Sequence, residues 1–378
     1  MLFITLSEYD DMGKKASILS EGKIKLAPCA GVFYNPHMEL CRDISSLCVG
    51  ALPGKLTVAD AMCASGVRGL RYKKENPNVK SLSLSDYSSK AISCARKNAA
   101  LNNVKCTIKK ADACEFMRKN EFGLLELDPF GSPQPFLHDA AYSFRASKCG
   151  FLSLTATDMA VLCGAHHAAC LKYYGAAPLD NEFCHENAVR ILIGKAILEF
   201  APFNLSVNPI FSFSHRHYVK VVLSIGKGSD GAVAAVKSLG HVSYCPGCCY
   251  REARRLPLKE NCPACGHQLQ LAGPLYLGRL WDTPLLERML LLNSKRKLSR
   301  GKEIEKILRT MLQESRIDAY GYYDLHTLAK KNVAPIMAVD EAPLCLAQAG
   351  FAATRTHFCP TAIRTDAPHE AILKMVKE

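Results

Sequence analysis

The most constraining feature of this chain is a series of short strand-like segments that each end at, or shortly before, an aspartate. These segments span residues 55–59, 81–85, 105–109 and 122–127, and helical patterns alternate with them. Strands and helices that alternate at this spacing are typical of βαβ units, which build a parallel sheet. The sequence therefore predicts an open α/β sheet with acids at the carboxyl ends of its strands. These acids are Asp60, Asp86, Asp112 and Asp128.

Further segments extend this pattern on both sides. Residues 150–155 form a fifth apolar segment, and helical patterns at about 136–147 and 185–200 provide crossovers. Residues 212–225 alternate between polar and apolar positions, which predicts one antiparallel strand that closes an edge of the sheet. Residues 1–35 read as a short β-rich leader.

Length and charge predict two domains and a polyanionic partner. A chain of 378 residues is too long for one ordinary domain. Turn-forming residues at 226–231 mark the boundary, so we expect a leader and sheet domain at 1–226 and a second domain at 227–378. Lys and Arg total 48 against 35 Asp and Glu, which gives a formal charge of +13. This excess favours a nucleic acid partner, and a basic protein without such a partner is the alternative.

The cysteines and the absence of long apolar runs predict a cytoplasmic protein. The 18 cysteines are scattered along the chain, and the first residues lack the basic start of a signal peptide. No run approaches the ~18 apolar residues that a membrane span needs, so no membrane partner is expected. In a reducing compartment most cysteines would serve as small core residues and a few as metal ligands.

Two pairs of cysteines have the spacing of a structural zinc site. The pattern is C-x2-C, 13 residues, then C-x2-C, within a module at about 241–272. Two such pairs supply four thiolates to a closed tetrahedral zinc ion, as in zinc ribbons. Cys249 and His267 are rival ligands that fit the paired pattern less well. The predicted ligands are Cys245, Cys248, Cys262 and Cys265.

Two other regions carry weaker signals. Residues 283–315 predict a basic amphipathic helix with one docking face, and its basic face would either contact phosphates or stay solvated. A group of cysteines and histidines has helical spacing among alanines, which favours packing over metal binding. This group is Cys163, His166, His167 and Cys170.

The turn after the first strand and the acids after it indicate a nucleoside-type cofactor. Two glycines, Gly66 and Gly69, permit close approach of a ligand to the backbone at a helix N-terminus. Asp86 lies 26 residues after Asp60, close to the offset at which an acid accepts ribose hydroxyls. Asp112 suits the amine of adenine, with the Ala113 N–H nearby. The alternative is that these acids only cap helices. Since no phosphate-binding loop is present, a nucleoside without pyrophosphate fits best, and S-adenosyl-L-methionine is such a ligand.

The segment Asp128-Pro129-Phe130 suits methyl transfer to a base amine. Such an amine is a poor nucleophile, because its lone pair is delocalised into the ring. A carboxylate from Asp128 and the carbonyl of Pro129 can accept its two hydrogens and turn the lone pair toward an electrophile. Phe130 can stack on a base that has left its helix. The sequence therefore predicts catalysis at the end of the fourth strand.

Several motifs together resemble the tRNA guanine-26 N2-dimethyltransferase family in its archaeal form. The resemblance runs from about residue 20 to the C-terminus and implies a Rossmann-like class I methyltransferase sheet. It also implies a smaller C-terminal α/β domain that binds tRNA and carries the zinc-ribbon-like insertion. The implied reaction takes two methyl groups from S-adenosyl-L-methionine to the N2 amine of guanine 26. The motifs are Asp128–Pro133, Thr155–Asp158, Leu162–His166, Phe33–Pro36 and Ala353–Phe358.

The resemblance also implies roles for individual residues. Asp128 and Pro129 would hold the amine, and Phe33 and Phe130 would contact the guanine ring. The family usually has arginine where this chain has His37, which leaves Arg42 as the main cation for the methionine carboxylate. The predicted cofactor residues are Arg42, Asp60, Asp86, Asp112 and Ala113.

Two alternatives remain open from the sequence. A methyltransferase that acts on a base amine of DNA or another RNA would use the same acid at the fourth strand. A zinc-ribbon RNA-binding protein with an inactive methyltransferase fold would keep the basic charge and the cysteines. We expect a monomer without an obligate protein partner.

Overall fold

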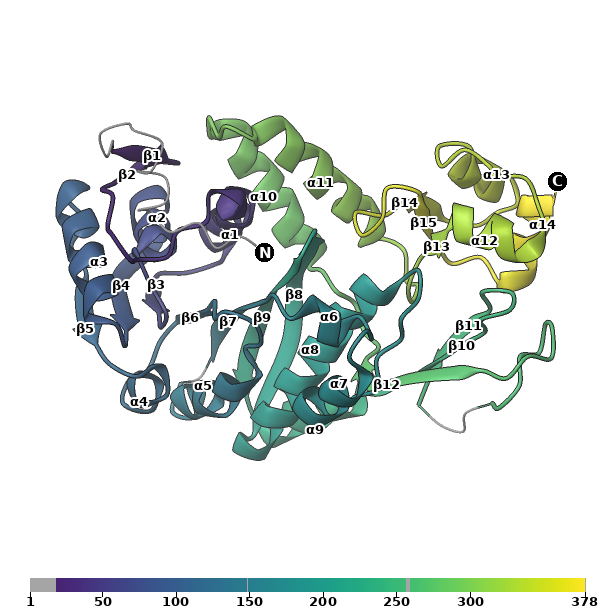
Figure 1. Ribbon diagram of the computed structural model, residues 1–378, viewed down its shortest axis with the longest axis horizontal. Helices are drawn as coiled ribbons and strands as arrows, with labels where there is room; N and C mark the ends of the chain where they lie inside the picture. The colour runs from purple at the N-terminus through teal and green to yellow at the C-terminus, as the bar shows by residue number, and fades with distance from the viewer. Residues whose placement is uncertain (1–17, 148, 256–258, 378) are drawn as a thin grey trace.

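The structure is a computed structural model that describes residues 18–147, 149–255 and 259–377, so residues 1–17 of the predicted leader lie outside the described residues. Its centre is a sheet of seven strands (Figure 1). The strands are β3 (Leu56–Asp60), β4 (Val79–Asp86), β5 (Thr107–Lys110), β6 (Leu124–Leu127), β7 (Cys149–Ala156), β8 (Leu205–His215) and β9 (Tyr218–Lys227).

The strand order places the four acids along one edge of this sheet. The order is β5-β4-β3-β6-β7-β9-β8, and β3 to β7 run parallel. The chain reverses its direction of winding between β3 and β6, where an open α/β sheet has its ligand crevice. Asp60 and Asp86 end β3 and β4, Asp112 lies two residues after β5, and Asp128 directly follows β6. The predicted α/β sheet is confirmed.

The antiparallel edge differs from the sequence prediction. One strand at 212–225 was expected, but β8 and β9 form a hairpin whose turn lies at Arg216. Arg216 has φ 51°, a left-handed conformation that usually selects glycine or asparagine, so no turn signal marks it. β9 continues the sheet by pairing antiparallel with β7.

Helices cover both faces of the sheet (Figure 1). Their starts follow capping chemistry, since Ser88 and Asp112 accept hydrogen bonds from the first turns of α3 and α4. Among the described residues, no helix is both long and apolar enough to cross a membrane. One face carries α1 (Glu39–Ala51), α2 (Val67–Glu75) and α3 (Ser89–Leu101), and the other carries α4 (Ala113–Arg118), α5 (Leu137–Phe144) and α8 (Cys184–Phe200).

A leader hairpin packs against the first of these faces. It consists of β1 (Leu19–Glu21) and β2 (Ile24–Leu26), and a short helix at Pro36–Met38 follows it. A disulfide between Cys29 and Cys94 joins the leader to α3. This pair was not among the roles that the sequence predicted for cysteines.

The second half of the chain leaves the large sheet but stays packed against it. The predicted helix at 283–315 is in fact two helices, which contact each other and break at 296–300. Arg296 in this break donates to Asn76 at 2.6 Å and so docks on the first half of the chain. The predicted boundary at 226/227 stays a prediction. The helices of this part are α9 (Ser229–Lys237), α10 (Thr283–Lys295) and α11 (Gly301–Glu314), and two short helices lie earlier, between β7 and α8: α6 (Met159–Leu162) and α7 (His167–Tyr174).

Two small antiparallel sheets complete the C-terminal region (Figure 1). The first sheet has the order β11-β10-β12 and holds the predicted zinc module, and the second has the order β13-β15-β14. Their strands are β10 (Leu239–Tyr244), β11 (Arg251–Arg254), β12 (Gln270–Tyr276), β13 (Tyr323–Asp324), β14 (Ala353–Arg355) and β15 (Ala362–Thr365). The last helices are α12 (Leu325–Asn332), α13 (Ala342–Gln348) and α14 (His369–Lys377).

Candidate active site

Asp128 lies at the carboxyl end of β6 with its side chain 26% exposed to the crevice. The guanidinium of Arg68 on α2 donates to its Oδ2 at 2.5 Å. Although burial opposes ionisation, Arg68 and the ammonium of Lys220 hold the pKa of Asp128 below its usual value. Asp128 is therefore an ionised hydrogen-bond acceptor at the pH of a cell.

A buried group of charges lies beneath this carboxylate. Glu126 is fully buried on β6 and accepts from the Tyr72 hydroxyl at 2.8 Å and from Lys220. Arg68 Nε is 3.7 Å from the Glu126 carboxylate, and Lys220 Nζ donates to Thr155 Oγ1 at 3.0 Å. Two cations thus balance the two acids, which keeps Asp128 charged and fixed in direction.

The turn after Asp128 is tied to the segment that follows β7. Gly131 has φ 80°, and its N–H donates to Thr157 Oγ1 at 2.8 Å. Ser132 Oγ lies 2.7 Å from the Tyr174 hydroxyl, which donates to Asp158 at 2.8 Å. These bonds hold the Pro-Phe-Gly-Ser turn against the end of the neighbouring strand. Tyr174 was missed in the sequence, because it lies in a separate helix.

The two aromatic residues predicted to contact the base lie together at this turn. The rings of Phe33 and Phe130 meet edge to face, with centroids 4.5 Å apart and an interplanar angle of 85°. Phe130 is 68% exposed, which is unusual for a phenylalanine. The leader thus brings Phe33 across more than 90 residues to a ring at the crevice.

The predicted cofactor acids have local partners in the structure. Asp86 accepts from the N–H groups of Ala64 and Ser88, both at 2.9 Å. Asp112 is exposed and accepts from Cys114 N at 2.9 Å, and Ala113 is the first residue of α4. Asp112 thus caps α4, as the alternative interpretation expected, whereas Asp86 joins the loop after β3 to the turn before α3 and caps no helix. The roles of both acids toward a ligand stay predictions.

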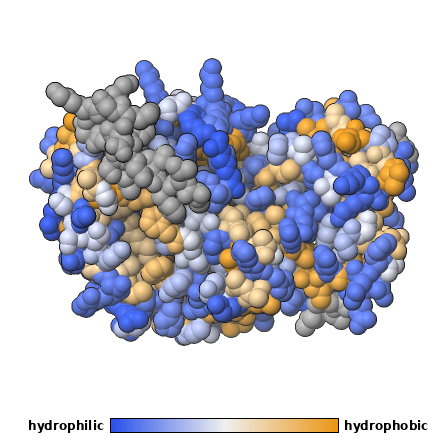
Figure 2. All heavy atoms as spheres, in the orientation of Figure 1, coloured by the Kyte–Doolittle hydropathy of each residue, from blue (hydrophilic) through white to orange (hydrophobic). Residues whose placement is uncertain are grey.

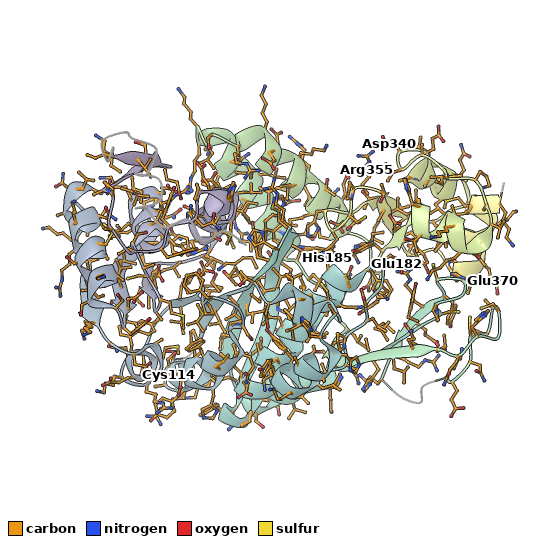
Figure 3. All side chains as sticks on the ribbon, viewed as in Figure 1. Cys114, Glu182, His185, Asp340, Arg355 and Glu370 are labelled. Carbon is orange, nitrogen blue, oxygen red and sulfur yellow. A yellow bond between two sulfur atoms is a disulfide. The ribbon has the colours of Figure 1, made fainter. Side chains whose placement is uncertain are left out.

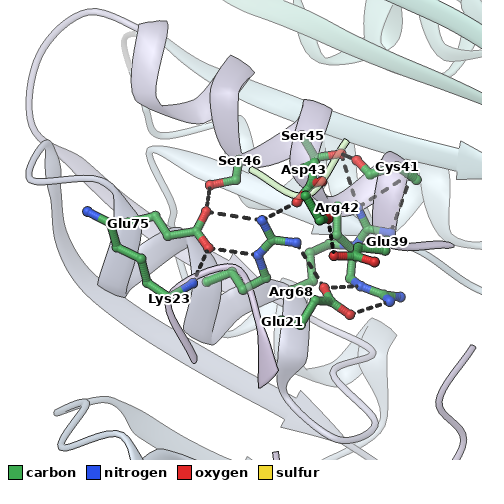
Figure 4. Close-up of polar contacts among 12 residues, drawn as sticks. Glu21, Lys23, Glu39, Cys41, Arg42, Asp43, Ser45, Ser46, Arg68 and Glu75 are labelled. Atoms are coloured by element: carbon green, nitrogen blue, oxygen red, sulfur yellow. Dashed lines mark hydrogen bonds and ion pairs between the residues drawn. The ribbon is translucent and has the colours of Figure 1, made fainter. Parts of the chain in front are cut away.

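Arg42 is buried against the leader (Figure 4). It donates twice to the Glu21 carboxylate at 2.6 Å and once to the Asn35 carbonyl at 3.0 Å. Although burial opposes ionisation, Arg42 and Arg71 lower the pKa of Glu21 to about 2. Arg42 thus anchors the hairpin that precedes Phe33, and its predicted contact with the cofactor stays a prediction.

Three residues of this crevice were not assigned a role from the sequence. Arg68 follows the glycine turn, and Lys220 is a single charge within an apolar strand. Tyr87 directly follows Asp86 and is 79% exposed, so its ring is free to lie over a planar ligand. Two features of the sequence could have indicated such residues. Lys220 is a charge flanked by apolar residues, and Tyr87 is an aromatic residue directly after the acid that ends a strand.

Asp60 is buried at the end of β3, and its titration predicts a pH-dependent stability. Burial and the nearby Glu126 raise its pKa to about 7, whereas an unfolded chain keeps it near 3.8. The folded state therefore binds the extra proton between about pH 4 and pH 7, so this group reduces stability as the pH rises through that window. The advantage in stability of Asp60→Asn over wild type should be about 3 kcal/mol larger at pH 8 than at pH 4.5. Urea unfolding at both pH values measures this, and a parallel shift at both would contradict it.

The four predicted zinc ligands come together in the first small sheet. Their sulfur atoms all lie within 4.8 Å of one another. Sulfurs on one tetrahedral zinc ion are about 3.8 Å apart, which fits the 3.3 Å from Cys245 to Cys265 and the 3.6 Å from Cys248 to Cys262. Cys249 and His267 lie outside this group, and the Tyr244 hydroxyl donates to the Cys249 sulfur at 3.9 Å.

Comparison with known proteins shows the family to which this chain belongs. The family model described as N2,N2-dimethylguanosine tRNA methyltransferase matches residues 13–377. The chain belongs to this family. It is 35% identical over 363 residues to the tRNA (guanine(26)-N(2))-dimethyltransferase of Methanobrevibacter smithii, covering 93% of each chain. It is also 36% identical over 359 residues to the tRNA (guanine(26)-N(2)/guanine(27)-N(2))-dimethyltransferase of Aquifex aeolicus, covering 92% of this chain and 90% of that one.

A solved structure of the same family matches the whole fold. The complex of Trm1 from Pyrococcus horikoshii with S-adenosyl-L-methionine superposes with a TM-score of 0.88 at 33% identity, covering 96% of this chain and 100% of that chain. The resemblance stated from the motifs and the class I methyltransferase sheet are both confirmed.

Proposed function

We propose that this enzyme transfers two methyl groups from S-adenosyl-L-methionine to the N2 amine of guanine 26 in tRNA, which gives N2,N2-dimethylguanosine. The observation that carries the proposal is the ionised Asp128 at the end of β6, next to Pro129 and the paired rings of Phe33 and Phe130. Membership of the dimethylguanosine family supports it.

The geometry suits a reaction that depends on positioning. The Asp128 carboxylate accepts one hydrogen of the guanine amine and the Pro129 carbonyl accepts the other, so the nitrogen lone pair points out of the ring plane. Proline has no N–H that would compete for this carbonyl. S-adenosyl-L-methionine, when bound, supplies an electrophilic methyl group. Each transfer would form the N–C bond, break the S–C bond to leave S-adenosyl-L-homocysteine, and release one amine proton, which Asp128 can accept and pass to water. After the first transfer one amine hydrogen remains, and a single acceptor suffices to orient the second reaction.

The cofactor would lie along the ends of β3, β4 and β5. Asp86 would accept ribose hydroxyls, and Asp112 together with the N–H of Ala113 would contact the adenine edge. Gly66 at the start of α2 has φ 78°, and a Cβ there would lie 3.3 Å from the side chains of Leu84 and Ala95, so glycine lets this turn pack against β4 and α3 beside the proposed site. Asp60 and Arg42 complete the proposed cofactor set near the methionine portion.

Phe130 should contribute mainly to binding of the flipped base. The two rings are in contact, so a guanine stacked between them would have to separate them to about 7 Å, twice the usual stacking distance. Phe130→Ala should raise the KM for tRNA about 10- to 100-fold, because stacking contributes about 1 to 3 kcal/mol per base. Phe130→Tyr keeps a ring and serves as the control. Steady-state kinetics with a tRNA transcript test this, and an unchanged KM for the alanine variant would refute the stacking role.

The basic helices α10 and α11 form a surface suited to tRNA phosphates. Hydrophilic side chains project from this part of the molecule at the top of Figure 2. The net charge of +13 supports a polyanionic substrate. A monomeric state and a cytoplasmic location stay predictions. The exposed basic residues of this surface are Lys295, Lys297, Lys302, Lys306 and Arg309.

The four-cysteine group would hold a structural Zn²⁺. Its four sulfurs leave no ligand position for water, so the ion would fold the module and take no part in methyl transfer. Cys262→Ser should abolish the hydrogen-exchange protection of β10 to β12 while the affinity for S-adenosyl-L-methionine stays within about twofold of wild type. Hydrogen exchange with mass spectrometry and calorimetry measure the two effects. Loss of cofactor binding in this variant would contradict the separation of the two sites.

A nucleoside map of the product tests the proposed function. A tRNA transcript incubated with enzyme and labelled cofactor should yield N2-methylguanosine and then N2,N2-dimethylguanosine at position 26. A transcript with adenine at position 26 is the matched control and should take up no label at that position. Methylation of another base amine, or of DNA, would instead support the alternative of the same class. Binding of tRNA without binding of the cofactor would favour an inactive methyltransferase fold.

A further inference from the structure

A second group of metal-binding side chains lies outside the zinc ribbon. It consists of Cys163, Cys184 and His185, whose ligand atoms all lie within 4.8 Å of one another. The Cys184 sulfur is 3.9 Å from His185 Nδ1. All three side chains are half-buried. Figure 3 shows His185 between the central sheet and the C-terminal helices, in the part of the chain where α8 begins.

The backbone brings Cys163 to this position through a required glycine. Cys163 ends the short helix α6, and Gly164 follows with φ 102°. A Cβ at Gly164 would lie 2.7 Å from the backbone nitrogen of Asp180, closer than carbon atoms tolerate. Only glycine therefore lets the end of α6 close on the loop that leads into Cys184 and His185.

This grouping differs from the one expected from the sequence. Cys163, His166, His167 and Cys170 were predicted to pack along one helix, but α7 begins only at His167. Cys170 does pack in the core, whereas His166 and His167 are exposed. Cys163 instead faces residues that follow it by about 20 positions. Sequence spacing could not reveal this pair, because the intervening segment folds back on itself.

We propose that Cys163, Cys184 and His185 bind a second Zn²⁺ ion, with water as the fourth ligand. Ligand atoms on one tetrahedral zinc ion lie about 3.6 to 3.8 Å apart, and the 3.9 Å from Cys184 to His185 needs little adjustment. Two thiolates and a neutral imidazole balance the charge of the ion. The half-buried position gives the ion a path from solvent. The two thiols are not joined to each other, in contrast to the disulfide of Cys29 and Cys94.

Such an ion would stabilise the Pro-Phe-Gly-Ser turn of the candidate active site through the residues that pack against it. It joins the end of α6 to the start of α8, and α6 directly follows Asp158. Asp158 and Tyr174 in turn hold Ser132 of the Pro-Phe-Gly-Ser turn. The metal site thus stabilises the segment that carries Phe130. This consequence rests on the proposed function, but the metal site itself does not.

Metal content of the full chain tests the site. Protein that is purified without oxygen, reduced and loaded with Zn²⁺ should contain two ions per chain by mass spectrometry, one for each cysteine group. The double variant Cys163→Ser/Cys184→Ser should contain one ion. Cys170→Ser is the control, because this buried cysteine lies nearby outside the group, and it should keep two. Conversely, Cys262→Ser should lose only the ribbon ion.

Cobalt gives an independent readout. Six thiolates would bind Co²⁺ in the wild type and four in the double variant, so the thiolate-to-cobalt absorption should fall to about two-thirds. The proposal would be overturned if the wild-type chain and the double variant each contained one zinc ion. It would also be overturned if the double variant and the wild type had the same cobalt absorption spectrum. Two ions in a protein that fails to methylate tRNA would leave the metal site intact and refute the proposed function instead.

Discussion

Replacing Asp128 with asparagine should lower kcat about 100- to 1,000-fold while the KM for tRNA and the affinity for the cofactor change little. The amide keeps the size of the side chain but loses the negative charge, and its NH2 group presents donors where the guanine amine needs an acceptor. Loss of one preorganised electrostatic contact to a transition state has effects of about this size, roughly 2.7 to 4 kcal/mol. Single-turnover kinetics with a tRNA transcript measure the chemical step directly.

The control for this substitution is another aspartate that is paired with an arginine. Asp139 on α5 accepts from Arg118 Nε at 2.5 Å and is nearly buried, but it is assigned no role toward substrate or cofactor. Asp139→Asn removes an ion pair of the same length, although Arg118 is 59% exposed whereas Arg68 is 5% exposed, and it should leave kcat within about twofold of wild type. If Asp128→Asn retained normal single-turnover rates, the amine would have to be oriented by other groups and the assigned role would be wrong.

The parallel part of the fold could be predicted because its signals are local. Each strand from β3 to β6 is a short segment that ends at or just before an acid. The apolar side chains of β3, β4 and β6 are buried in a sheet covered on both faces, whereas β5 at the sheet edge is mostly exposed. The hairpin of β8 and β9 was missed because its turn has a left-handed backbone conformation at Arg216, where the sequence has neither glycine nor asparagine to indicate a turn. The break between α10 and α11 was also missed, since helical periodicity continues across it.

The site residues that could be predicted are those that directly follow a recognisable strand or belong to a recognisable motif. Asp128 and Phe130 follow a strand, so their position at the crevice was inferred directly, and the resemblance added Phe33 from the leader. Arg68 and Lys220 come from α2 and β9, and their approach to Asp128 depends on the order of strands in the sheet. A sequence does not contain this order. The charges that set the pKa of Asp128 therefore became visible only in the fold.

Lys220 should be the most sensitive of these charges for stability. Its side chain is 1% exposed and pairs with the fully buried Glu126. Lys220→Met fills a similar volume but leaves Glu126 with only a weaker contact to Arg68 at 3.7 Å and the Tyr72 hydroxyl. Breaking a buried pair on one side has a cost of about 3 to 5 kcal/mol. Urea unfolding of the purified variant should show a loss of that size.

The double variant Lys220→Met/Glu126→Gln separates this effect from a simple loss of packing. It removes the uncompensated charge, so it should recover at least half of the lost stability, and a double variant as unstable as Lys220→Met would contradict the electrostatic explanation. Lys220 also lowers the pKa of Asp128, so the acid limb of the methyl-transfer rate should move to higher pH in Lys220→Met. Arg68 remains beside Asp128 in this variant, and activity near neutral pH should persist. One buried lysine on β9 would thus stabilise the sheet and also help to keep Asp128, the proposed catalytic carboxylate, ionised.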